Sequence, residues 1–174
     1  MQVAVPARRR ADTAPMRALW IGLCCCAAAH AAAAGEPAPT TAEVRTFMAQ
    51  VAAASRARDV EAIAAALSSD CRIEFRSVIG GREQVTLLTR AEYVKFLKTD
   101  LAALNDLSGY DYRSSTLKVS IDHEPPGATV VSRVHESFTV GEQRRVMDSL
   151  ETARVERRDG ALKLVAVSAE TEGR

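Results

Sequence analysis

The stretch DVEAIAAALSSDCRIEF, residues 59–75, changes its hydrophobic period part-way along. Asp59 can cap a short helix, and apolar residues follow it at helical spacing: Val60, Ile63, Ala64 and Leu67. Apolar residues then alternate with charged ones, as in a strand with one buried face: Cys71, Ile73 and Phe75. The stretch predicts a helix that runs directly into a half-buried strand, which is typical of a domain that combines helices with a sheet.

Capping boxes on either side of this stretch predict two further helices. Thr40 stands three residues before Glu43, and an apolar face follows: Val44, Phe47, Met48 and Val51. This helix should run to about Arg56. Thr89 stands in the same relation to Glu92, and it predicts a helix with one apolar face: Tyr93, Phe96, Leu97 and Leu101.

The rest of the chain predicts strands joined by turns. Gly80-Gly81 indicates a tight hairpin with Val85 and Leu87 on the return strand, and residues 105–112 are polar and turn-like. Four strands should follow in a meander: residues 117–121, 128–140, 144–158 and 162–168. In the first of these strands one face is apolar: Leu117, Val119 and Ile121. The order predicts an α+β fold, with a curved antiparallel sheet packed on three helices from the N-terminal half.

This order of elements resembles the nuclear-transport-factor-2-like superfamily, which includes the SnoaL-like proteins and ketosteroid isomerase. Residues 59–75 carry the resemblance, and ERRDGALKL, residues 156–164, resembles the family's closing hairpin, which often has Trp where Leu162 stands. The resemblance implies a cone-shaped domain, residues 41–170, with a pocket on the concave side of the sheet. Members range from isomerases and dehydratases to binding modules, so the fold alone does not assign a reaction.

Residues 1–34 have the three parts of a secretory signal peptide. Arginines precede an apolar run, ALWIGLCCCAAA at residues 18–29, and small residues follow it in the spacing that signal peptidase accepts. The run is shorter than the roughly 20 apolar residues that a membrane-spanning helix needs. We therefore expect cleavage, a flexible tether at residues 35–40, and a periplasmic or secreted domain with no transmembrane helix.

The positions of the cysteines bear on how the leader is processed and on what stabilises the domain. A leader cysteine could instead be lipidated, although Leu23 stands before Cys24 where a small residue is expected. After cleavage Cys71 is alone, so no internal disulfide can form and the core must hold the domain together. Its place in an apolar pattern indicates a buried, inert thiol rather than a reactive one.

Charge argues against a nucleic-acid partner. The chain has 23 basic and 22 acidic residues, and once the arginines of residues 1–34 are set aside the acidic side chains slightly outnumber the basic ones. No basic stripe remains to neutralise a phosphate backbone.

The long hairpin of residues 128–158 places two carboxylates on an apolar wall. If Gly141-Glu142 is a two-residue turn, paired residues have numbers that sum to 283, and Ser132 faces Glu151 while Glu136 faces Met147. One face then collects mostly apolar side chains together with both glutamates. A carboxylate on such a wall has a raised pKa and suits a general acid or base.

From this register we predict a ligand pocket with a defined lining: Phe75, Ser132, Val134, Glu136, Phe138, Met147 and Glu151. Glu136 and Glu151 are the candidate catalytic residues, and they need not act together, because they lie roughly four residue steps, about 10 Å or more, apart along the ladder. The alternative is that the strands bend so that both carboxylates reach water, or that Arg133 or Arg154 neutralises one of them. By the resemblance, ketosteroid isomerase has its Asp base where Phe75 stands here, which argues against isomerase-type proton transfer.

Three other groups of residues give weaker evidence for a functional site. Asp122-His123-Glu124 is a sequential triplet in a turn without a partner ligand, so we expect no metal site, and no motif indicates a cofactor. Ser132 and His135 should face opposite sides of the sheet, which excludes a triad of these two with Asp148. Tyr110 and Tyr112 could border a pocket mouth or simply pack.

Two classes of function remain open, and a third is weaker. The first is an exported domain without catalysis that binds a small apolar or amphipathic ligand, or that binds a partner protein or a second copy through the other sheet face, with its polar row: Arg133, His135, Ser137 and Thr139. The resemblance implies a homodimer through that face. The second is an isomerase, dehydratase or hydrolase that uses a pocket carboxylate. The third is an accessory domain of a cell-envelope assembly.

Overall fold

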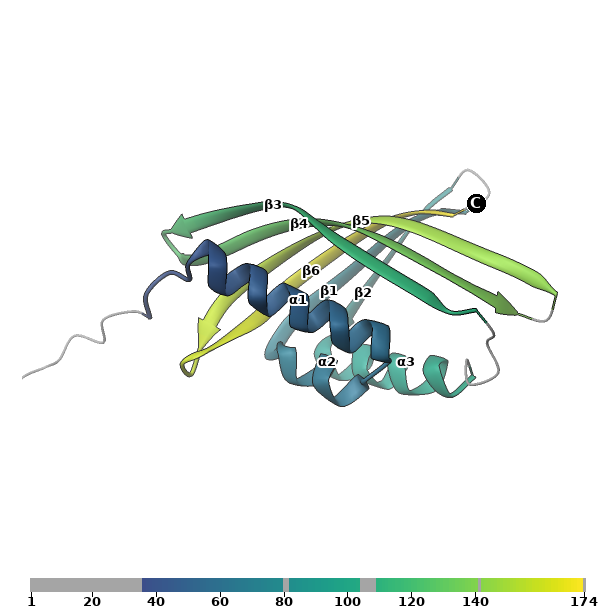
Figure 1. Ribbon diagram of the computed structural model, residues 1–174, viewed down its shortest axis with the longest axis horizontal. Coiled ribbons are helices and arrows are strands. Elements are labelled where there is room, and N and C mark those ends of the chain that lie inside the picture. The colour runs from purple at the N-terminus through teal and green to yellow at the C-terminus, as the bar shows by residue number, and fades with distance from the viewer. Residues whose placement is uncertain (1–35, 80–81, 104–108, 141, 174) are drawn as a thin grey trace, which may run out of the picture. The chain divides into compact units, whose positions relative to one another are not determined.

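The computed structural model describes residues 36–79, 82–103, 109–140 and 142–173. The predicted signal peptide, the Gly80-Gly81 turn, residues 104–108 and Gly141 lie outside these residues. Within them, three helices of the N-terminal half lie on one face of a six-stranded sheet (Figure 1). The predicted α+β class is confirmed. We call the face that the helices cover the inner face.

The helices begin where the capping residues predicted. They are α1 (Thr41–Ala57), α2 (Val60–Ala66) and α3 (Arg90–Ala103). The Glu43 backbone N–H donates to Thr40 Oγ1 (3.3 Å), and the Glu43 carboxylate accepts from the Thr40 backbone N–H (2.8 Å). Thr89 and Glu92 repeat this capping box at α3. Asp59 caps α2 by accepting from the Ala62 N–H (3.0 Å).

The sheet has the strand order β2-β1-β6-β5-β4-β3. Its strands are β1 (Leu67–Ile79), β2 (Arg82–Thr89), β3 (Asp111–His123), β4 (Pro126–Val140), β5 (Gln143–Arg158) and β6 (Ala161–Gly173). All neighbouring pairs are antiparallel except β1 and β6, which are parallel. The predicted antiparallel sheet is confirmed for the other pairs, and the sequence did not reveal this parallel pair, because α3 and the meander separate the two strands and no local turn links them.

The register of the long hairpin is confirmed. Val130 pairs with Ala153, Ser132 with Glu151, and Glu136 with Met147. Because directly paired residues project on the same side of a sheet, these pairs share one face. The face is the inner one, since Val130 and Ala153 pack in the core with α1.

A β-bulge in β3 corrects the predicted alternation. Thr116 pairs with Ser132 and Lys118 with Val131, so Leu117 is the extra residue, and its side chain is 51% exposed. Leu117 therefore does not share a face with its predicted neighbours Val119 and Ile121.

The predicted turn before this strand is also too long at its end, since Asp111 and Tyr112 already belong to β3. Tyr112 pairs directly with Glu136 and lies on the inner face. Without the bulge, strict alternation from Val119 would have placed Tyr112 on the outer face.

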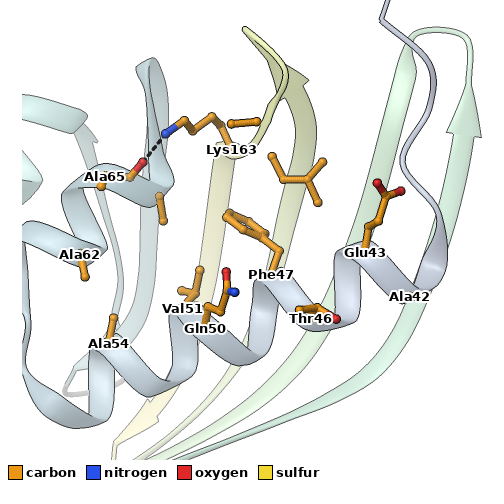
Figure 2. Close-up of a pocket in the computed structure, with 13 residues that line it drawn as sticks. Ala42, Glu43, Thr46, Phe47, Gln50, Val51, Ala54, Ala62, Ala65 and Lys163 are labelled. Atoms are coloured by element: carbon orange, nitrogen blue, oxygen red, sulfur yellow. Dashed lines mark hydrogen bonds between the residues drawn. The ribbon is translucent and has the colours of Figure 1, made fainter.

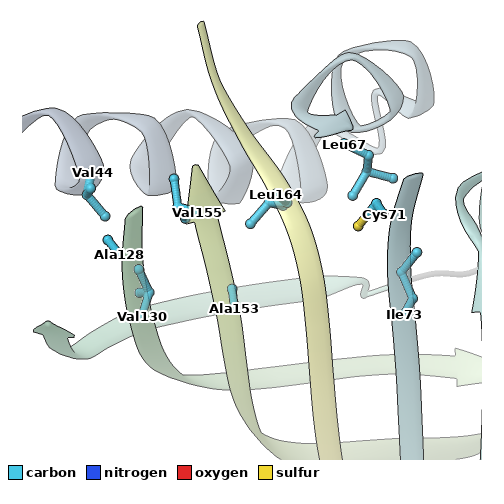
Figure 3. Close-up of a cluster of buried hydrophobic side chains, with 9 residues drawn as sticks. All are labelled: Val44, Leu67, Cys71, Ile73, Ala128, Val130, Ala153, Val155 and Leu164. Atoms are coloured by element: carbon cyan, nitrogen blue, oxygen red, sulfur yellow. The ribbon is translucent and has the colours of Figure 1, made fainter. Parts of the chain in front are cut away.

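One end of the inner face is a packed apolar core, which we call the closed end. Figure 3 shows its nine buried side chains, with Val44 of α1 pointing toward Ala128: Val44, Leu67, Cys71, Ile73, Ala128, Val130, Ala153, Val155 and Leu164. Cys71 is 2% exposed, and burial raises the pKa of its thiol to about 11, as expected of an inert thiol. The closed end supplies the hydrophobic stabilisation that the sequence assigned to a core without disulfides.

Candidate functional site

The predicted pocket residues lie beyond the closed end, on the same inner face. One row of direct pairs crosses four strands, from Phe75 on β1 through Ala169 and Glu151 to Ser132 on β4. A second row joins Tyr112, Glu136 and Met147. The register therefore brings residues of β1, β3, β4, β5 and β6 to one surface.

Solvent exposure separates this region from the closed end. Six of its side chains are half-buried, which means that water reaches part of each: Phe75, Tyr93, Tyr112, Glu136, Met147 and Glu151. We call these six residues the open end. The predicted lining residues Ser132 and Val134 are buried at its base, 2% and 3% exposed. Phe138 is half-buried and pairs with exposed Arg145 near the hairpin tip, two residues beyond Glu136.

Glu151 holds its proton more tightly than an ordinary glutamate. Burial, and secondly the negative charge of Glu136, raise the pKa of Glu151 to about 7. The two carboxyl groups are therefore electrostatically coupled even though they sit on different strands. A carboxyl group with a pKa near neutrality is protonated in part of the molecules and ionised in the rest at pH 7.

All three tyrosines of the chain adjoin these carboxyl groups. Burial, and then the charge of Glu151, raise the pKa of Tyr93 on α3. Burial and the charge of Glu136 raise the pKa of Tyr110, whose hydroxyl donates a hydrogen bond to Glu136. Burial and Glu151 raise the pKa of Tyr112 to about 12. At neutral pH the tyrosines are therefore O–H groups next to acidic ones.

Three contacts hold the tyrosines in place. The Tyr93 ring lies 5.9 Å from the Phe75 ring, measured between centroids, which ties α3 to β1. The Arg58 guanidinium lies 4.0 Å from the centroid of the Tyr110 ring, and Arg58 is also the left-handed C-cap of α1. Tyr112 shares side-chain hydrogen bonds with Ser55 of α1.

Tyr93 is the residue that the sequence prediction of the site missed. The sequence places it on the apolar face of the helix that Thr89 caps, where a tyrosine packs as readily as a phenylalanine. The signal that could have found it is its hydroxyl, since a phenol on an otherwise apolar helix face needs a polar neighbour when it is buried.

Ser132 adds an unsatisfied polar group beside Glu151. Its side chain is 2% exposed, and its hydroxyl has no hydrogen-bond partner among the described residues. Ser132 is the direct cross-strand neighbour of Glu151. Buried hydroxyl groups are nearly always hydrogen-bonded, so Ser132 lacks the partner that such a group usually has.

The arginines that could have neutralised the glutamates are on the outer face. Arg154 pairs with Asp122 and, at 3.2 Å, with Glu156. Arg133 is exposed and alternates with buried Ser132 and Val134. The alternative of a neutralised pocket carboxylate is therefore wrong for both arginines.

The outer row includes the histidine that the sequence placed there. His135 Nδ1 lies 2.8 Å from Asp148 Oδ1, on the face opposite Ser132, so the exclusion of a serine triad is confirmed. The predicted polar row has one exception, because Ser137 is fully buried and accepts a hydrogen bond from Arg144 (3.4 Å). Its short side chain lies between its pairing partners Asp111 and Val146, which leave it no contact with water.

The outer face also has a groove of about 780 Å³ along β1, β5 and β6. Charged side chains line it alongside Leu150: Arg76, Glu83, Arg133, Asp148 and Glu170. Large apolar side chains are exposed on the same face: Val78 at 63%, Val85 at 50%, Leu87 at 70% and Leu150 at 44%.

A second groove, of about 730 Å³, lies between α1, α2 and the start of β6 (Figure 2). Alanines and Phe47 make up much of its wall, and its charged residues already have partners. Glu43 belongs to the capping box and pairs with Arg157 (2.9 Å), while Lys163 donates to the Ala65 carbonyl. These contacts, with the Thr40 backbone N–H first, lower the pKa of Glu43 to about 2. The groove therefore offers no acid or base for chemistry.

Two searches of the described residues bear on other classes of site. No three His, Cys, Asp or Glu side chains of the described residues come together as metal ligands. None of the described helices is long and apolar enough to cross a membrane.

Solved structures with the same arrangement identify the fold. A conserved protein from Planctomyces limnophilus is 14% identical, with a TM-score of 0.60 over 76% of this chain and 96% of its own. An NTF2-like protein from Cytophaga hutchinsonii is also 14% identical, with a TM-score of 0.55 over 76% and 98%. This chain has the nuclear-transport-factor-2-like fold.

The resemblance read from the sequence is thus confirmed at the level of the fold. A ketosteroid isomerase-like protein from Erwinia carotovora atroseptica shares the nuclear-transport-factor-2-like fold at 15% identity, with a TM-score of 0.52 over 75% of this chain and 94% of its own. Such identities establish a common fold and no common reaction. No protein-family model and no curated protein sequence matches the chain.

Proposed function

We propose that this domain binds a small, partly apolar molecule at the open end of the inner face. The observation that carries the proposal is the pairing of Glu151, a half-buried carboxyl group, with Ser132, a buried hydroxyl group without a partner among the described residues. Glu136 and the tyrosine hydroxyls would hold the polar part of the molecule. Phe75 and Met147 would contact its apolar part.

The energetics of the open end support a binding role over a structural one. A buried carboxyl group and an unpaired hydroxyl both cost stability, whereas apolar residues at the same positions would extend the core. The closed end uses such residues on the same two strands, with Val130 and Ala153 two residues away from Ser132 and Glu151. Polar groups retained at that cost are typical of a binding site.

A larger side chain placed at the open end tests the binding site and leaves both carboxylates in place. Ala169, 3% exposed, lies between Phe75 and Glu151 in their row, so Ala169→Leu should occupy part of the open end. Ala166→Leu is the matched control, because Ala166 pairs with Arg72 and Arg154 on the outer face of the same strand. In a thermal-shift screen of small amphipathic molecules, hits should stabilise the wild type and Ala166→Leu but not Ala169→Leu. Equal stabilisation of both variants would place the ligand elsewhere.

A second candidate function is acid–base catalysis on the bound molecule. The observation that favours it is the pKa of Glu151, raised to about 7, since a catalytic acid or base works best when its pKa lies near the working pH. The Tyr110 hydroxyl bonded to Glu136 adds an O–H donor. These groups suit the isomerase, dehydratase or hydrolase class and do not choose among them.

Proton exchange distinguishes catalysis from binding alone. Carbonyl compounds found to bind would be incubated with the protein in D2O, and NMR would follow deuterium entry at carbon. An acid–base enzyme should accelerate this exchange, and Glu151→Gln should abolish the acceleration while Glu170→Gln, on the outer face of β6, should keep it. Bound compounds that exchange no faster than in buffer would argue for a binding protein.

We also propose that the domain works outside the cytoplasm, because residues 1–34 have the composition of a signal peptide. Fractionation of cells that express the full chain, followed by the intact mass of the product, tests this. A periplasmic or secreted product that begins near residue 35 is expected, and a fatty-acid mass on a leader cysteine would instead identify a lipoprotein. An uncleaved cytoplasmic product would contradict export.

Self-association through the outer face is proposed on its exposed apolar residues. Val78, Val85, Leu87 and Leu150 surround charged side chains of both signs, a composition that suits contact with a second copy. Sedimentation velocity should show a dimer that Leu87→Asp disrupts. A monomer at high concentration in the wild type would contradict the proposal.

A further inference from the structure

The charges that face the open end are unbalanced. Glu136 on β4 and Glu151 on β5 are its carboxyl groups, and the other titratable groups beside them are acidic too: Tyr93 of α3, Tyr110, and Tyr112 of β3. Two arginines of the described residues lie near these acidic groups, and each contacts another partner at the edge of the open end. Arg58 lies on the Tyr110 ring, and Arg90 donates to the Ala64 carbonyl at 2.9 Å.

We infer that the molecule bound at the open end carries a basic nitrogen, whose positive charge is held by Glu136 and Glu151. This inference rests on the proposed binding function and names the chemical class of its ligand. A cation offsets the poor solvation of the Glu151 carboxylate and its repulsion by the Glu136 charge. A neutral or anionic ligand would leave that repulsion in place or increase it.

The oxygen acceptors at the open end suit an ammonium group. An ammonium group has N–H donors and no acceptor, so it needs oxygen acceptors around it. Ser132 Oγ, without a partner at the base of the open end, and the two carboxylates are such acceptors. The half-buried rings of Phe75 and Tyr93, 5.9 Å apart, add aromatic faces that attract a cation and pack against an apolar substituent.

Binding of a cation should also expel a proton. Glu151 is partly protonated near pH 7 because burial and Glu136 disfavour its charged form. A positive charge beside it favours the charged form, so the carboxyl group ionises and the proton goes to the buffer. A neutral ligand held at the same place has no such effect.

Three probes of one shape test the charge preference. Benzylamine, benzyl alcohol and benzoate share a ring and differ in being positive, neutral and negative at pH 7. Isothermal titration calorimetry should find benzylamine bound at least about tenfold more tightly than benzyl alcohol, and benzoate not bound. Titrations of benzylamine in two buffers of different ionisation enthalpy should show release of a fraction of a proton.

Variants that each remove one negative charge show which carboxyl groups bind benzylamine and release the proton. Glu151→Gln and Glu136→Gln should each weaken benzylamine binding about tenfold or more, and Glu151→Gln should remove the proton release. Glu170→Gln changes the net charge equally on the outer face of β6 and should leave both quantities unchanged. Circular dichroism of each variant confirms that it is folded.

The remaining outcomes decide against the inference in distinguishable ways. Benzyl alcohol or benzoate bound as tightly as benzylamine would overturn the amine assignment and leave the proposed binding function intact. Benzylamine weakened equally by Glu170→Gln and Glu151→Gln would show a surface charge effect and overturn the assignment. If none of the probes binds while the amphipathic screen yields a neutral ligand blocked by Ala169→Leu, the inference fails and the proposed function stands.

Discussion

The two ends of the inner face share strands β4 and β5 but differ in the side chains that they place there. At the closed end, Ala128, Val130, Ala153 and Val155 are at most 4% exposed and pack against Val44 of α1. A few residues along the same strands, Glu136 and Glu151 are half-buried carboxyl groups. The register that aligns one end also aligns the other, so core and site are parts of one surface.

The difference shows how a domain without disulfides can hold a costly site. The closed end buries apolar side chains completely and stabilises the fold, while the open end keeps polar groups that weaken it. Because the strands are continuous, the packed end positions the polar end without adding residues to it. Substitutions at the two ends should therefore differ in kind as well as in size.

The largest effect is expected from truncating the closed end. Ile73 is 2% exposed and lies two residues before Phe75 on β1. Ile73→Ala should lower the free energy of unfolding by about 3 kcal/mol, since it removes buried methyl groups and leaves a cavity. Urea denaturation measures this. A loss below about 1 kcal/mol would mean that the closed end is loosely packed and that the comparison fails.

A smaller and pH-dependent effect is expected at Glu151. Its pKa is about 7 in the folded protein against an ordinary 4.5, so the folded state disfavours ionisation. The stability that this group allows is fully present below pH 4.5 and is lost as the pH rises through 7. Glu151→Gln should match the wild type at pH 4 and exceed it by about 2–3 kcal/mol at pH 8, since one pKa unit is worth about 1.4 kcal/mol. Unfolding curves that differ equally at both pH values would contradict the raised pKa.

The tyrosines should report the same acidic surroundings. Ultraviolet titration of the folded protein should show little phenolate at pH 10, where an unperturbed tyrosine is half ionised, because all three have raised pKa values. Tyr112 should ionise near pH 12. Glu136→Gln should lower the midpoint of Tyr110 by removing its hydrogen-bond acceptor and a nearby charge. A wild-type midpoint near 10, with the fold retained by circular dichroism, would show that the open end is more hydrated than described.

The smallest effect is expected at the bulge. Leu117 is 51% exposed and outside the pairing of β3, so Leu117→Ala should change the free energy of unfolding by less than about 0.5 kcal/mol. Val119→Ala is the comparison, because Val119 pairs with buried Val130 and packs against the core. It should cost clearly more. Equal losses at both positions would favour the plain alternation that the sequence predicted.

Much of the candidate site could be predicted from the sequence of one hairpin. The two-residue connection between β4 and β5 determined which residues pair, and the apolar pattern determined which face is inner, so Ser132, Glu136, Met147 and Glu151 could be placed together from sequence. Tyr110 and Tyr112 were proposed from sequence only as residues that could border a pocket mouth, and Tyr93 was missed. Tyr93 reaches the site only because α3 packs on β1 near Phe75, and Tyr112 only because Leu117 is bulged.

The sequence by itself determined the helix starts at Thr40, Asp59 and Thr89, the α+β class and the register of the long hairpin. These features depend on groups a few residues apart, whose hydrogen bonds and turn lengths are local. Only the tertiary structure decided the parallel pairing of β1 with β6, the bulge at Leu117 and the gathering of three tyrosines around two glutamates. Those depend on how distant segments pack on one another, and no local spacing of residues encodes that.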